Sequence, residues 1–186
     1  MNTSFSRQTI ATVAGLLLAM TLPSVAGQLV KQDVEGIRNF TRVDATVACA
    51  GATAVEAIPE LKRQGFRAIV NLRLATEDGA NVEESQTAAE SAGLRYLHIP
   101  FETVNPDFAV ADAFLAAVTD PENQPVFIHC GSANRVGALW LTKRVLKDGW
   151  AIEEAVKEAE AIGLRSDTLR EFALKYIEAR REHLER

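Results

Sequence analysis

The sequence has few of the residues that hold small folds together through covalent bonds or a metal. It contains only two cysteines and three histidines among 186 residues. These are too few for a disulfide framework, and they lack the paired spacing of a zinc module. A Walker loop, a dinucleotide-binding fingerprint and a serine-centred nucleophile elbow are also missing. We therefore expect neither a metal nor a cofactor.

Basic residues are also fewer than acidic residues. Twenty Lys and Arg stand against 25 Asp and Glu, which gives a formal charge of −5. Nucleic acids and anionic membranes are bound through surplus basic residues, so neither is expected as a partner, and any anion site must be local. With 47% hydrophobic residues, the chain has the composition of a globular domain with a core of its own.

One uncharged apolar run, Ile10 to Leu22, is shorter than the roughly 20 residues that a transmembrane helix needs. It follows Arg7 and precedes the small residues Ser24-Val25-Ala26, which is the pattern that signal peptidase reads. We expect residues 1–26 to be a signal peptide cleaved before Gly27, with an uncleaved membrane anchor as the alternative. The mature protein would then be periplasmic or secreted, without stable membrane insertion, and residues 27–186 would form one domain.

Beyond Gly27 the chain alternates short apolar runs with amphipathic stretches and shows no internal repeat. Proline is tolerated only in the first turn of a helix, so Pro59 implies that the first helix starts late or bends. Strands alternating with helices predict an α/β fold with a mostly parallel sheet flanked by helices. The expected strands are 40–43, 46–50, 68–72, 95–99 and 126–128, and the expected helices are one ending at Gln64, then 83–92, 108–118, 135–148, 151–162 and the segment from Ser166.

The candidate catalytic and anion-binding residues lie mainly between Val126 and Gly137. A strand is followed by Cys130, then by the small residues Gly131, Ser132, Ala133 and Asn134, and a helix begins at Arg135. Small residues let successive backbone N–H groups turn inward, and the helix start adds the positive end of its dipole, so this loop predicts an anion cradle. The cradle would stabilise the thiolate of Cys130. The planar guanidinium of Arg135 could donate two parallel hydrogen bonds to two oxygens of a phosphoryl group. The alternative is a buried structural cysteine beside a surface arginine.

This stretch resembles the Cys-dependent protein tyrosine and dual-specificity phosphatases, whose signature is His-Cys, a loop and then Arg. Segments 39–44, 65–73 and 98–102 look like that superfamily's opening strand, its helix-to-strand segment ending in Asn-Leu-Arg and the strand that leads into its general-acid loop. The sequence is similar in particular to the bacterial beta-lactamase-hydrolase-like phosphatases, in which the loop is commonly one residue shorter, as it is here. The resemblance implies a protein tyrosine phosphatase-like fold of the dual-specificity type, with residues 27–186 as the catalytic domain.

By the same resemblance, Cys130 would attack the phosphorus of a phosphorylated protein or small molecule and form a phosphocysteine. Arg135 and the loop residues Gly131, Ser132, Ala133 and Asn134 would hold the phosphate oxygens. His129 would orient the loop rather than transfer a proton.

Two positions depart from the superfamily pattern. Its general-acid Asp corresponds to Thr103, so Glu102 is the better acid candidate and Asp107, at a predicted helix start, the next. Val136 stands where the familiar enzymes carry a Ser or Thr that assists breakdown of the intermediate, which predicts slow turnover.

Two other functions stay open at this point. Rhodanese-type sulfurtransferases also place a cysteine-led cradle between a strand and a helix, and their shorter loop matches the spacing from Cys130 to Arg135. A catalytically weak domain that binds a phosphorylated or sulfated ligand is the other alternative. His129 before the cysteine and the segment 100–102 favour the phosphatase.

The two cysteines, Cys49 and Cys130, are the only pair that can form an intramolecular disulfide. In the fold that the resemblance implies, the segment 48–51 runs on the same side of the sheet as the cradle. An exported protein meets an oxidising environment, so we hypothesise a reversible Cys49–Cys130 disulfide that switches the enzyme off. The alternative is that Cys49 is a small buried hydrophobic residue.

Overall fold

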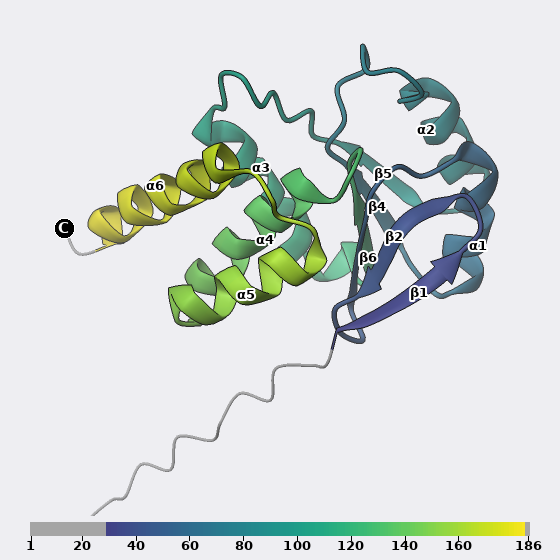
Figure 1. Cartoon of the computed structure of the whole chain (residues 1–186). Helices are drawn as coiled ribbons and strands as arrows, with labels where there is room; N and C mark the ends of the chain where they lie inside the picture. The colour runs from purple at the N-terminus through teal and green to yellow at the C-terminus, as the bar shows by residue number, and fades with distance from the viewer. Residues whose placement is uncertain (1–28, 185–186) are drawn as a thin grey trace, which may run out of the picture.

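The computed structural model describes residues 29–184 (Figure 1). The predicted signal peptide, residues 1–26, and its cleavage site before Gly27 lie outside the described residues. Between residues 29 and 184, no helix combines the length and the apolar character that crossing a membrane requires.

A six-stranded sheet with the order β1-β2-β3-β6-β4-β5 forms the centre of the molecule. Neighbours among β3, β6, β4 and β5 are parallel, whereas β1 and β2 are added antiparallel at one edge. The mostly parallel α/β sheet predicted from the sequence is therefore confirmed. The strands are β1 (Val30–Val34), β2 (Ile37–Arg42), β3 (Val47–Ala50), β4 (Ala68–Asn71), β5 (Arg95–His98) and β6 (Val126–His129).

Strand β1 is the one strand that the sequence did not predict. Four of its five residues are exposed and the fifth is half-buried. A strand that buries neither face carries no hydrophobic alternation to detect, because period-two patterning comes from packing one face on a core. By contrast, β3, β4 and β6 are buried at every position, and they appear in the sequence as nearly continuous apolar runs.

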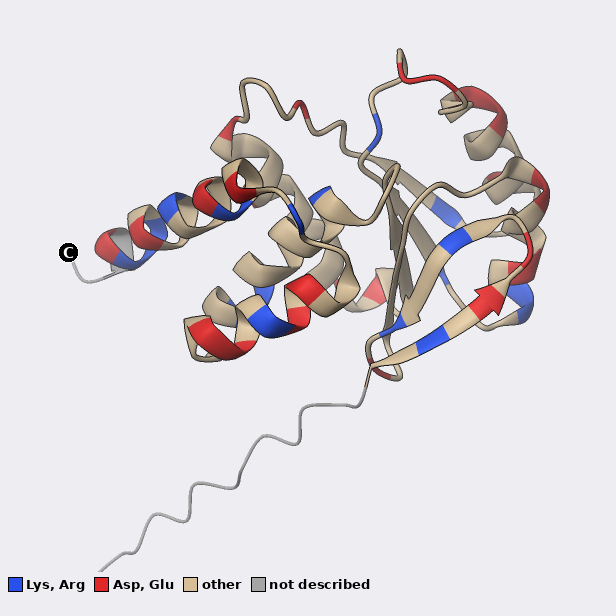
Figure 2. Cartoon of the chain, viewed as in Figure 1, with Lys and Arg blue, Asp and Glu red and all other residues tan. Residues whose placement is uncertain are grey.

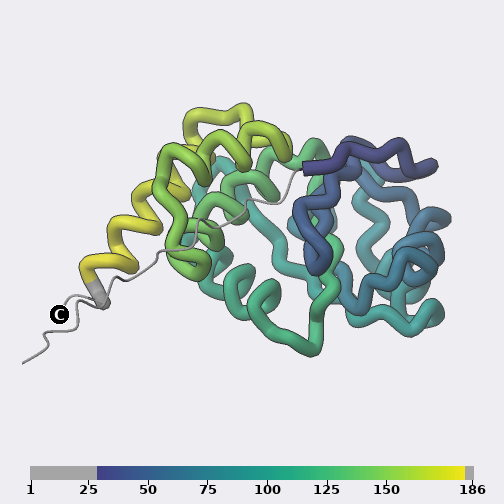
Figure 3. The backbone as a smooth tube through the Cα atoms, turned by 90° about the horizontal axis from the view of Figure 1, so that it is seen from below, coloured from purple at the N-terminus to yellow at the C-terminus, as the bar shows by residue number. Residues whose placement is uncertain are grey.

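Helices cover both faces of the sheet. In Figure 1, α1 and α2 lie on one side and α3, α4, α5 and α6 on the other, and each side has its own cluster of buried apolar side chains. Figure 3 shows the same division from below, with the yellow and green C-terminal helices in one half and the purple and blue N-terminal segments in the other. The helices are α1 (Ile58–Arg63), α2 (Val82–Ser91), α3 (Phe108–Thr119), α4 (Asn134–Leu146), α5 (Ile152–Ile162) and α6 (Asp167–Leu184), with short 3₁₀ turns at Val55–Ala57 and Pro121–Asn123.

The helix boundaries follow the local chemistry. Helix α1 begins at Ile58 with Pro59 in its first turn, so the prediction of a late start is confirmed and no bend is needed. Asp107 is the N-cap of α3, and its carboxylate accepts the N–H of Ala109 at 2.9 Å, as expected for a helix-start residue.

Helix α4 is the centre of the larger cluster. Nine of its residues, from Val136 to Val145, are buried, because α3, α5 and α6 pack around it and the sheet lies beneath it. Gly137 allows a close approach to α5: a Cβ at this position would lie 2.7 Å from the backbone oxygen of Ala159. Figure 2 shows many of the charged residues on α2, α5, α6 and the β1–β2 hairpin, whereas the central strands are tan, which marks uncharged residues. The burial of α4 and its close contact with α5 fix the position of its first turn at the end of β6.

Candidate active site

The predicted cradle lies at the carboxyl end of β6, the strand between β3 and β4. Open α/β sheets bind ligands at this edge, where the loops after neighbouring parallel strands meet. Two backbone hydrogen bonds attach the beginning of the loop to the end of β3 and the segment that follows: Cys130 N–H donates to Ala50 O at 3.3 Å, and Ala52 N–H donates to Gly131 O at 3.0 Å. The base of the cradle is thus fixed by backbone contacts.

The loop closes through an unusual conformation at Ala133. This residue has φ +69°, in the left-handed region, and is the N-cap of α4. Its carbonyl accepts the N–H of Gly137 at 2.9 Å, which starts the helix at Asn134, one residue earlier than predicted. The first N–H groups of a helix have no intrahelical partner, so the N-terminus of this thirteen-residue helix is a donor surface at the cradle.

Cys130 lies at the base of the cradle with 1% of its surface exposed. The preceding His129 is also buried, and its ring stacks on Phe127 with the centroids 5.8 Å apart. Burial, together with the positive charges of Arg73 and Arg135, lowers the pKa of His129 to about 3. His129 is therefore neutral near pH 7 and fits a role in packing the loop rather than in proton transfer.

Arg135 reaches back over the cradle and is tightly held. Its Nη1 donates to the backbone oxygens of Leu72 and Phe101 at 3.1 and 3.2 Å and to Glu77 Oε1 at 2.5 Å, and its Nη2 donates to Glu77 Oε2 at 2.8 Å. Burial alone would lower the pKa of Arg135, but the hydrogen bonds to Glu77 outweigh it and the pKa is raised. The guanidinium has one well-defined orientation.

The hydrogen bonds of Arg135 leave only some of its N–H donors for a ligand. The bonds described above use Nη1 and one hydrogen of Nη2. A guanidinium has five N–H donors, and no oxygen atom within residues 29–184 is bonded to Nε. The Nε–Nη2 edge therefore carries the donors that no oxygen atom of the described residues fully occupies, and the Cys130 side chain is hydrogen-bonded to the same guanidinium. Nη2 lies beside the cradle, 3.7 Å from the position that a Cβ on Gly131 would occupy.

Glu77, which orients Arg135, is itself held by the loop after β4. Its Oε1 accepts the N–H of Leu74 at 2.8 Å and its Oε2 accepts Arg73 Nε at 3.2 Å. Burial by itself would raise the pKa of Glu77, but the hydrogen bonds from Arg135, Leu74 and Arg73 lower it to about 2. Arg73 also binds the backbone oxygens of Asp78 and Gly79 at 2.5 and 2.6 Å, which fixes the shape of the loop.

Sequence reasoning missed Glu77 and included Arg73 only as the last residue of the segment 65–73 that carries the resemblance. A usable signal was present: the loop follows β4, a central parallel strand, so it had to emerge at the same edge of the sheet as the cradle. A carboxylate on such a loop is a natural partner for an arginine at the start of the next helix.

A cleft of about 440 Å³ opens beside the cradle. Its lining combines cradle residues with the loop after β4, the segment after β5 and the start of α6. The lining residues are Leu74, Glu77, Phe101, Thr103, Ser132, Asn134, Arg135, Ser166, Thr168 and Leu169.

Neither acid candidate lines this cleft. Glu102 is exposed, and its Oε1 accepts the N–H of Val104 at 2.9 Å within its own loop. Asp107 is engaged as the N-cap of α3. Thr103, at the superfamily's acid position, does line the cleft but cannot serve as a carboxylic acid.

The structure separates the predicted cradle residues into two groups. Gly131, Ser132 and Arg135 surround the mouth of the cradle above Cys130. Ala133 is fully buried. The Asn134 side chain points elsewhere, because its Oδ1 accepts the N–H groups of Arg165 and Ser166. A phosphate-binding role for Asn134 therefore rests on its backbone N–H alone.

Cys49 and Cys130 are both free and buried. Cys49 lies opposite Ile128 in the β3–β6 register, two residues before Cys130 along β6. From the spacings within and between strands, this offset puts the two Cα atoms about 8 Å apart, beyond the roughly 7 Å that a disulfide tolerates. Burial raises the pKa of the Cys49 thiol well above its usual value, and Glu158 adds to the effect. The hypothesised disulfide is not formed, and Cys49 acts as a small buried hydrophobic residue.

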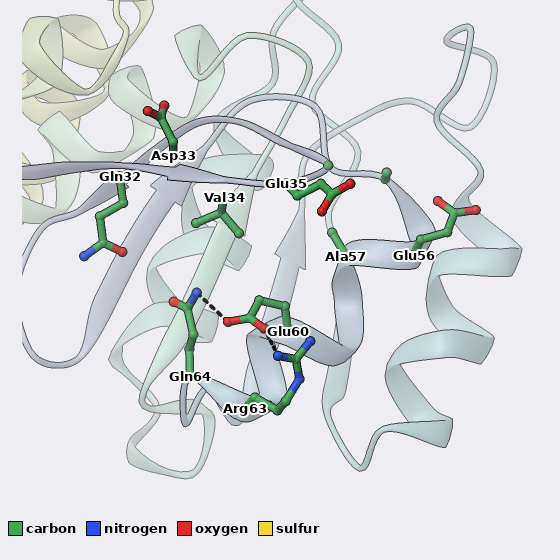
Figure 4. Close-up of a pocket in the computed structure, with 11 residues that line it drawn as sticks. Gln32, Asp33, Val34, Glu35, Glu56, Ala57, Glu60, Arg63 and Gln64 are labelled. Carbon is green, nitrogen blue, oxygen red and sulfur yellow. Dashed lines mark hydrogen bonds and ion pairs between the residues drawn. The ribbon is translucent and has the colours of Figure 1, made fainter.

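A larger cavity, about 1010 Å³, lies between the β1–β2 hairpin and α1 (Figure 4). In Figure 4, Gln32 and Val34 point from β1 toward α1, whereas Asp33 points away from it, and Glu60 contacts Arg63 and Gln64 on the α1 side. Its lining contains no cysteine, histidine, serine or threonine. Size alone does not identify a catalytic site, and the smaller cleft that holds the cradle is the candidate active site.

Comparisons with known proteins agree with this geometry. Residues 36–146 match the family described as "Beta-lactamase hydrolase-like protein, phosphatase-like domain". A beta-lactamase hydrolase-like protein of Agrobacterium fabrum is 31% identical over 109 residues, which are 56% of this chain and 25% of the relative. The chain thus spans about a quarter of the length of the curated relatives it matches.

Solved structures show the same fold at low sequence identity. TpbA of P. aeruginosa, solved in complex with pTyr, has a TM-score of 0.61 and 20% identity over 84% of this chain and 91% of its own. The core catalytic domain of the PP-IP phosphatase SIW14 of S. cerevisiae has a TM-score of 0.64 and 20% identity over 76% of this chain and 86% of its own. The fold is that of the protein tyrosine phosphatase-like enzymes, and the chain belongs to the family of beta-lactamase hydrolase-like phosphatase domains.

Proposed function

We propose that this protein hydrolyses a phosphate monoester through a phosphocysteine intermediate on Cys130. The observation that carries the proposal is the arrangement of three groups at the end of β6, where Arg135 lines the cleft and is hydrogen-bonded to the buried side chain of Cys130. Cys130 lies at the base, the N-terminus of α4 supplies backbone donors, and Glu77 holds Arg135 at 2.5 and 2.8 Å with its Nε–Nη2 edge available.

In the first step the Cys130 thiolate attacks phosphorus and forms an S–P bond while the bond to the leaving-group oxygen breaks. The leaving oxygen takes up a proton. Arg135 and the loop N–H groups bind the three non-bridging oxygens, whose negative charge they stabilise best in the trigonal-bipyramidal transition state. In the second step water attacks phosphorus, the S–P bond breaks, and phosphate and the thiolate are released.

We assign the general acid to Glu102, which lies next to the cleft-lining Thr103. Protonating the leaving group requires its carboxylate to leave the N–H of Val104, which it accepts at 2.9 Å, and to turn toward the cleft. A loop rearrangement of this kind accompanies substrate binding in many enzymes. Aryl phosphates with good leaving groups do not depend on it.

The substrate is proposed to be a phosphorylated protein or small molecule, met in the periplasm or outside the cell. The chain's negative charge, −5, disfavours polyanionic partners such as nucleic acid. The structural similarity to TpbA, which was solved with pTyr, supports a phosphoester as the ligand of the cradle.

The test is an assay of the purified full chain with p-nitrophenyl phosphate. We expect release of phosphate at a rate that Cys130→Ser abolishes, and a phosphate adduct of +80 Da, the mass of HPO₃, on the peptide that contains Cys130 after rapid acid quenching. Hydrolysis by the Cys130→Ser variant at the wild-type rate would refute the proposed nucleophile.

A second function is favoured by one specific observation, the four-residue spacing between Cys130 and Arg135. In a rhodanese-type reaction the thiolate would take the outer sulfur of thiosulfate as a persulfide and release sulfite, and cyanide would then accept that sulfur to give thiocyanate. Thiosulfate with cyanide, assayed in parallel with p-nitrophenyl phosphate, separates the two. Thiocyanate formation without phosphate release would establish the sulfurtransferase instead.

A further inference from the structure

The turn between α5 and α6, residues 163–166, packs directly on the end of the cradle loop and the start of α4. A Cβ on Gly163 would lie 2.8 Å from the Cβ of Ala133, and a Cβ on Gly137 would lie 2.9 Å from the backbone nitrogen of Leu164. Both distances are shorter than real Cβ contacts, so only glycine permits this approach. At these two points the turn contacts the Ala133 methyl group and the first turn of α4 directly.

Asn134 adds a third and directional connection. Its Oδ1 accepts the backbone N–H groups of Arg165 at 2.8 Å and Ser166 at 3.2 Å. The hydroxyl of Ser166 in turn accepts the N–H of Leu169 at 3.3 Å and caps α6. The first helical residue of the cradle thus determines where α6 begins, although 31 residues separate Asn134 from Arg165.

The start of α6 forms one wall of the cleft. Ser166, Thr168 and Leu169 line it together with Leu74 and Thr103. A phosphate bound by the cradle must direct its leaving group away from Cys130, because attack and departure occur in line. The leaving group therefore enters the part of the cleft bounded by this wall.

The charge of the lining indicates which leaving groups the wall accepts. Within residues 29–184, the charged side chains that line the cleft are Glu77 and Arg135, and they are bonded to each other. Arg165, which precedes Ser166, directs its guanidinium at the backbone oxygen of Glu160. Apart from the cradle and Glu77, the lining offers the hydroxyls of Thr103, Ser166 and Thr168 and apolar side chains, so a second anionic group on the substrate would find no cation there.

We propose that the start of α6, positioned by Asn134, is the specificity wall of the active site and selects phosphate esters with an uncharged leaving group. The inference rests on the proposed phosphatase function and deepens it. Thr168 is the exposed residue of the wall and contacts the leaving group, whereas Asn134 acts as a positioning residue for the wall.

The first experiment compares phenyl phosphate with 4-carboxyphenyl phosphate, whose leaving group carries one additional negative charge. We expect a lower KM for phenyl phosphate by about 5-fold, the effect of one lost hydrogen bond or unpaired charge. Thr168→Lys places a cation on the wall and should reduce or reverse this preference. Thr87→Lys, which adds the same charge on the exposed face of α2, is the matched control. Equal KM values in the wild type, or equal effects of the two lysine variants, would overturn the proposal.

The second experiment tests the positioning role. In Asn134→Ala, amide hydrogen exchange at Arg165 and Ser166 should accelerate and the KM for phenyl phosphate should rise 3- to 10-fold, from two lost hydrogen bonds. The inhibition constant of inorganic phosphate should change less than 2-fold, because the cradle backbone stays intact. Asn123→Ala, which removes a buried asparagine bonded to Ala117 O on the 3₁₀ turn before β6, is the control and should leave KM unchanged. Unchanged exchange at Arg165 and Ser166, or equal effects on KM and on phosphate inhibition, would overturn the role of Asn134.

Failure of the proposed function gives a different result. If the wild-type chain hydrolyses neither ester, the phosphatase assignment fails. Binding of the two esters to the Cys130→Ser chain then still tests the wall: a preference for phenyl phosphate that Thr168→Lys removes supports it, and the absence of a preference overturns it.

Discussion

Replacing Glu77 by glutamine removes the negative charge that orients Arg135 while keeping the shape of the side chain. Glutamine places an N–H₂ group against one of the guanidinium nitrogens, where two donors oppose each other. We expect Glu77→Gln to lower the free energy of unfolding and, because the Nε–Nη2 edge of Arg135 loses its fixed orientation, to lower kcat about 10-fold. Urea denaturation at pH 7 and p-nitrophenyl phosphate turnover measure the two effects.

The expected loss in the free energy of unfolding follows from the pKa of Glu77, which is about 2 in the folded protein against 4.5 for an unperturbed glutamate. Each pKa unit corresponds to about 1.4 kcal/mol, so the folded-state contacts of the carboxylate stabilise the protein by at most roughly 3 kcal/mol. With 27% of the side chain exposed, solvent screening reduces this to about 2 kcal/mol. A loss of 2 kcal/mol corresponds to a decrease in Tm of roughly 4–8 °C for a domain of this size.

The pH dependence separates this explanation from a packing effect. The folded-state pKa is depressed, so the stabilisation is present above about pH 4.5 and is lost as the pH falls toward 2. The difference in unfolding free energy between wild type and Glu77→Gln should shrink by about half between pH 7 and pH 3. Glu178→Gln, an exposed position on α6, should show no difference at either pH. A Glu77→Gln difference that is the same at pH 7 and pH 3 would refute the electrostatic reasoning.

Four further results are expected. Cys130→Ser should abolish turnover and retain phosphate binding, whereas Arg135→Ala should weaken both, as measured by p-nitrophenyl phosphate kinetics and phosphate titration; turnover at the wild-type rate in either variant contradicts the assignment. Glu102→Gln should slow alkyl phosphates at least 10-fold more than p-nitrophenyl phosphate, and equal losses would exclude Glu102 as the acid. Gly163→Ala should cost about 3 kcal/mol, because its φ of +154° and the 2.8 Å contact leave no room for a methyl group, and a Tm shift below 2 °C would contradict this contact. Cys49→Ala should recover from peroxide with dithiothreitol as fully as the wild type, and reduced recovery would show that Cys49 does protect the nucleophile.

The features that the sequence predicted are those that are encoded locally. The cradle is one continuous stretch, and the small residues, the cysteine and the arginine at a helix start carry their chemistry in their order. The buried strands and the late start at Pro59 are equally local. The beginning of α4 at Asn134 was missed by one residue, because Ala133, a residue with a Cβ, adopts the left-handed conformation at the N-cap.

The features that were missed depend on contacts between distant segments. Glu77 lies 58 residues before Arg135, and nothing in its own neighbourhood distinguishes it from other loop carboxylates. Asn134 was predicted to bind phosphate from its position in the loop, but its side chain binds a turn 31 residues later. The Cys49–Cys130 disulfide was expected from counting, whereas strand register decides the distance. Pattern reasoning predicted the candidate site, and the tertiary structure shows the contacts between its side chains and distant segments.

The length of the cradle loop is locked by the way its two ends are attached. At one end the Ala52–Gly131 backbone hydrogen bond ties the loop to the neighbouring strand, and at the other the Ala133 methyl group rests against Gly163. Insertion of a fifth residue between Cys130 and Arg135 would match the spacing of the familiar tyrosine phosphatases. Such an insertion would break one of the two attachments or displace the α5–α6 turn. For the same reason, a transition between the short and the long loop in evolution requires a compensating change at position 163 or in the segment after β3. Loop length is thus constrained by the surrounding scaffold as well as by residues 130–135 themselves.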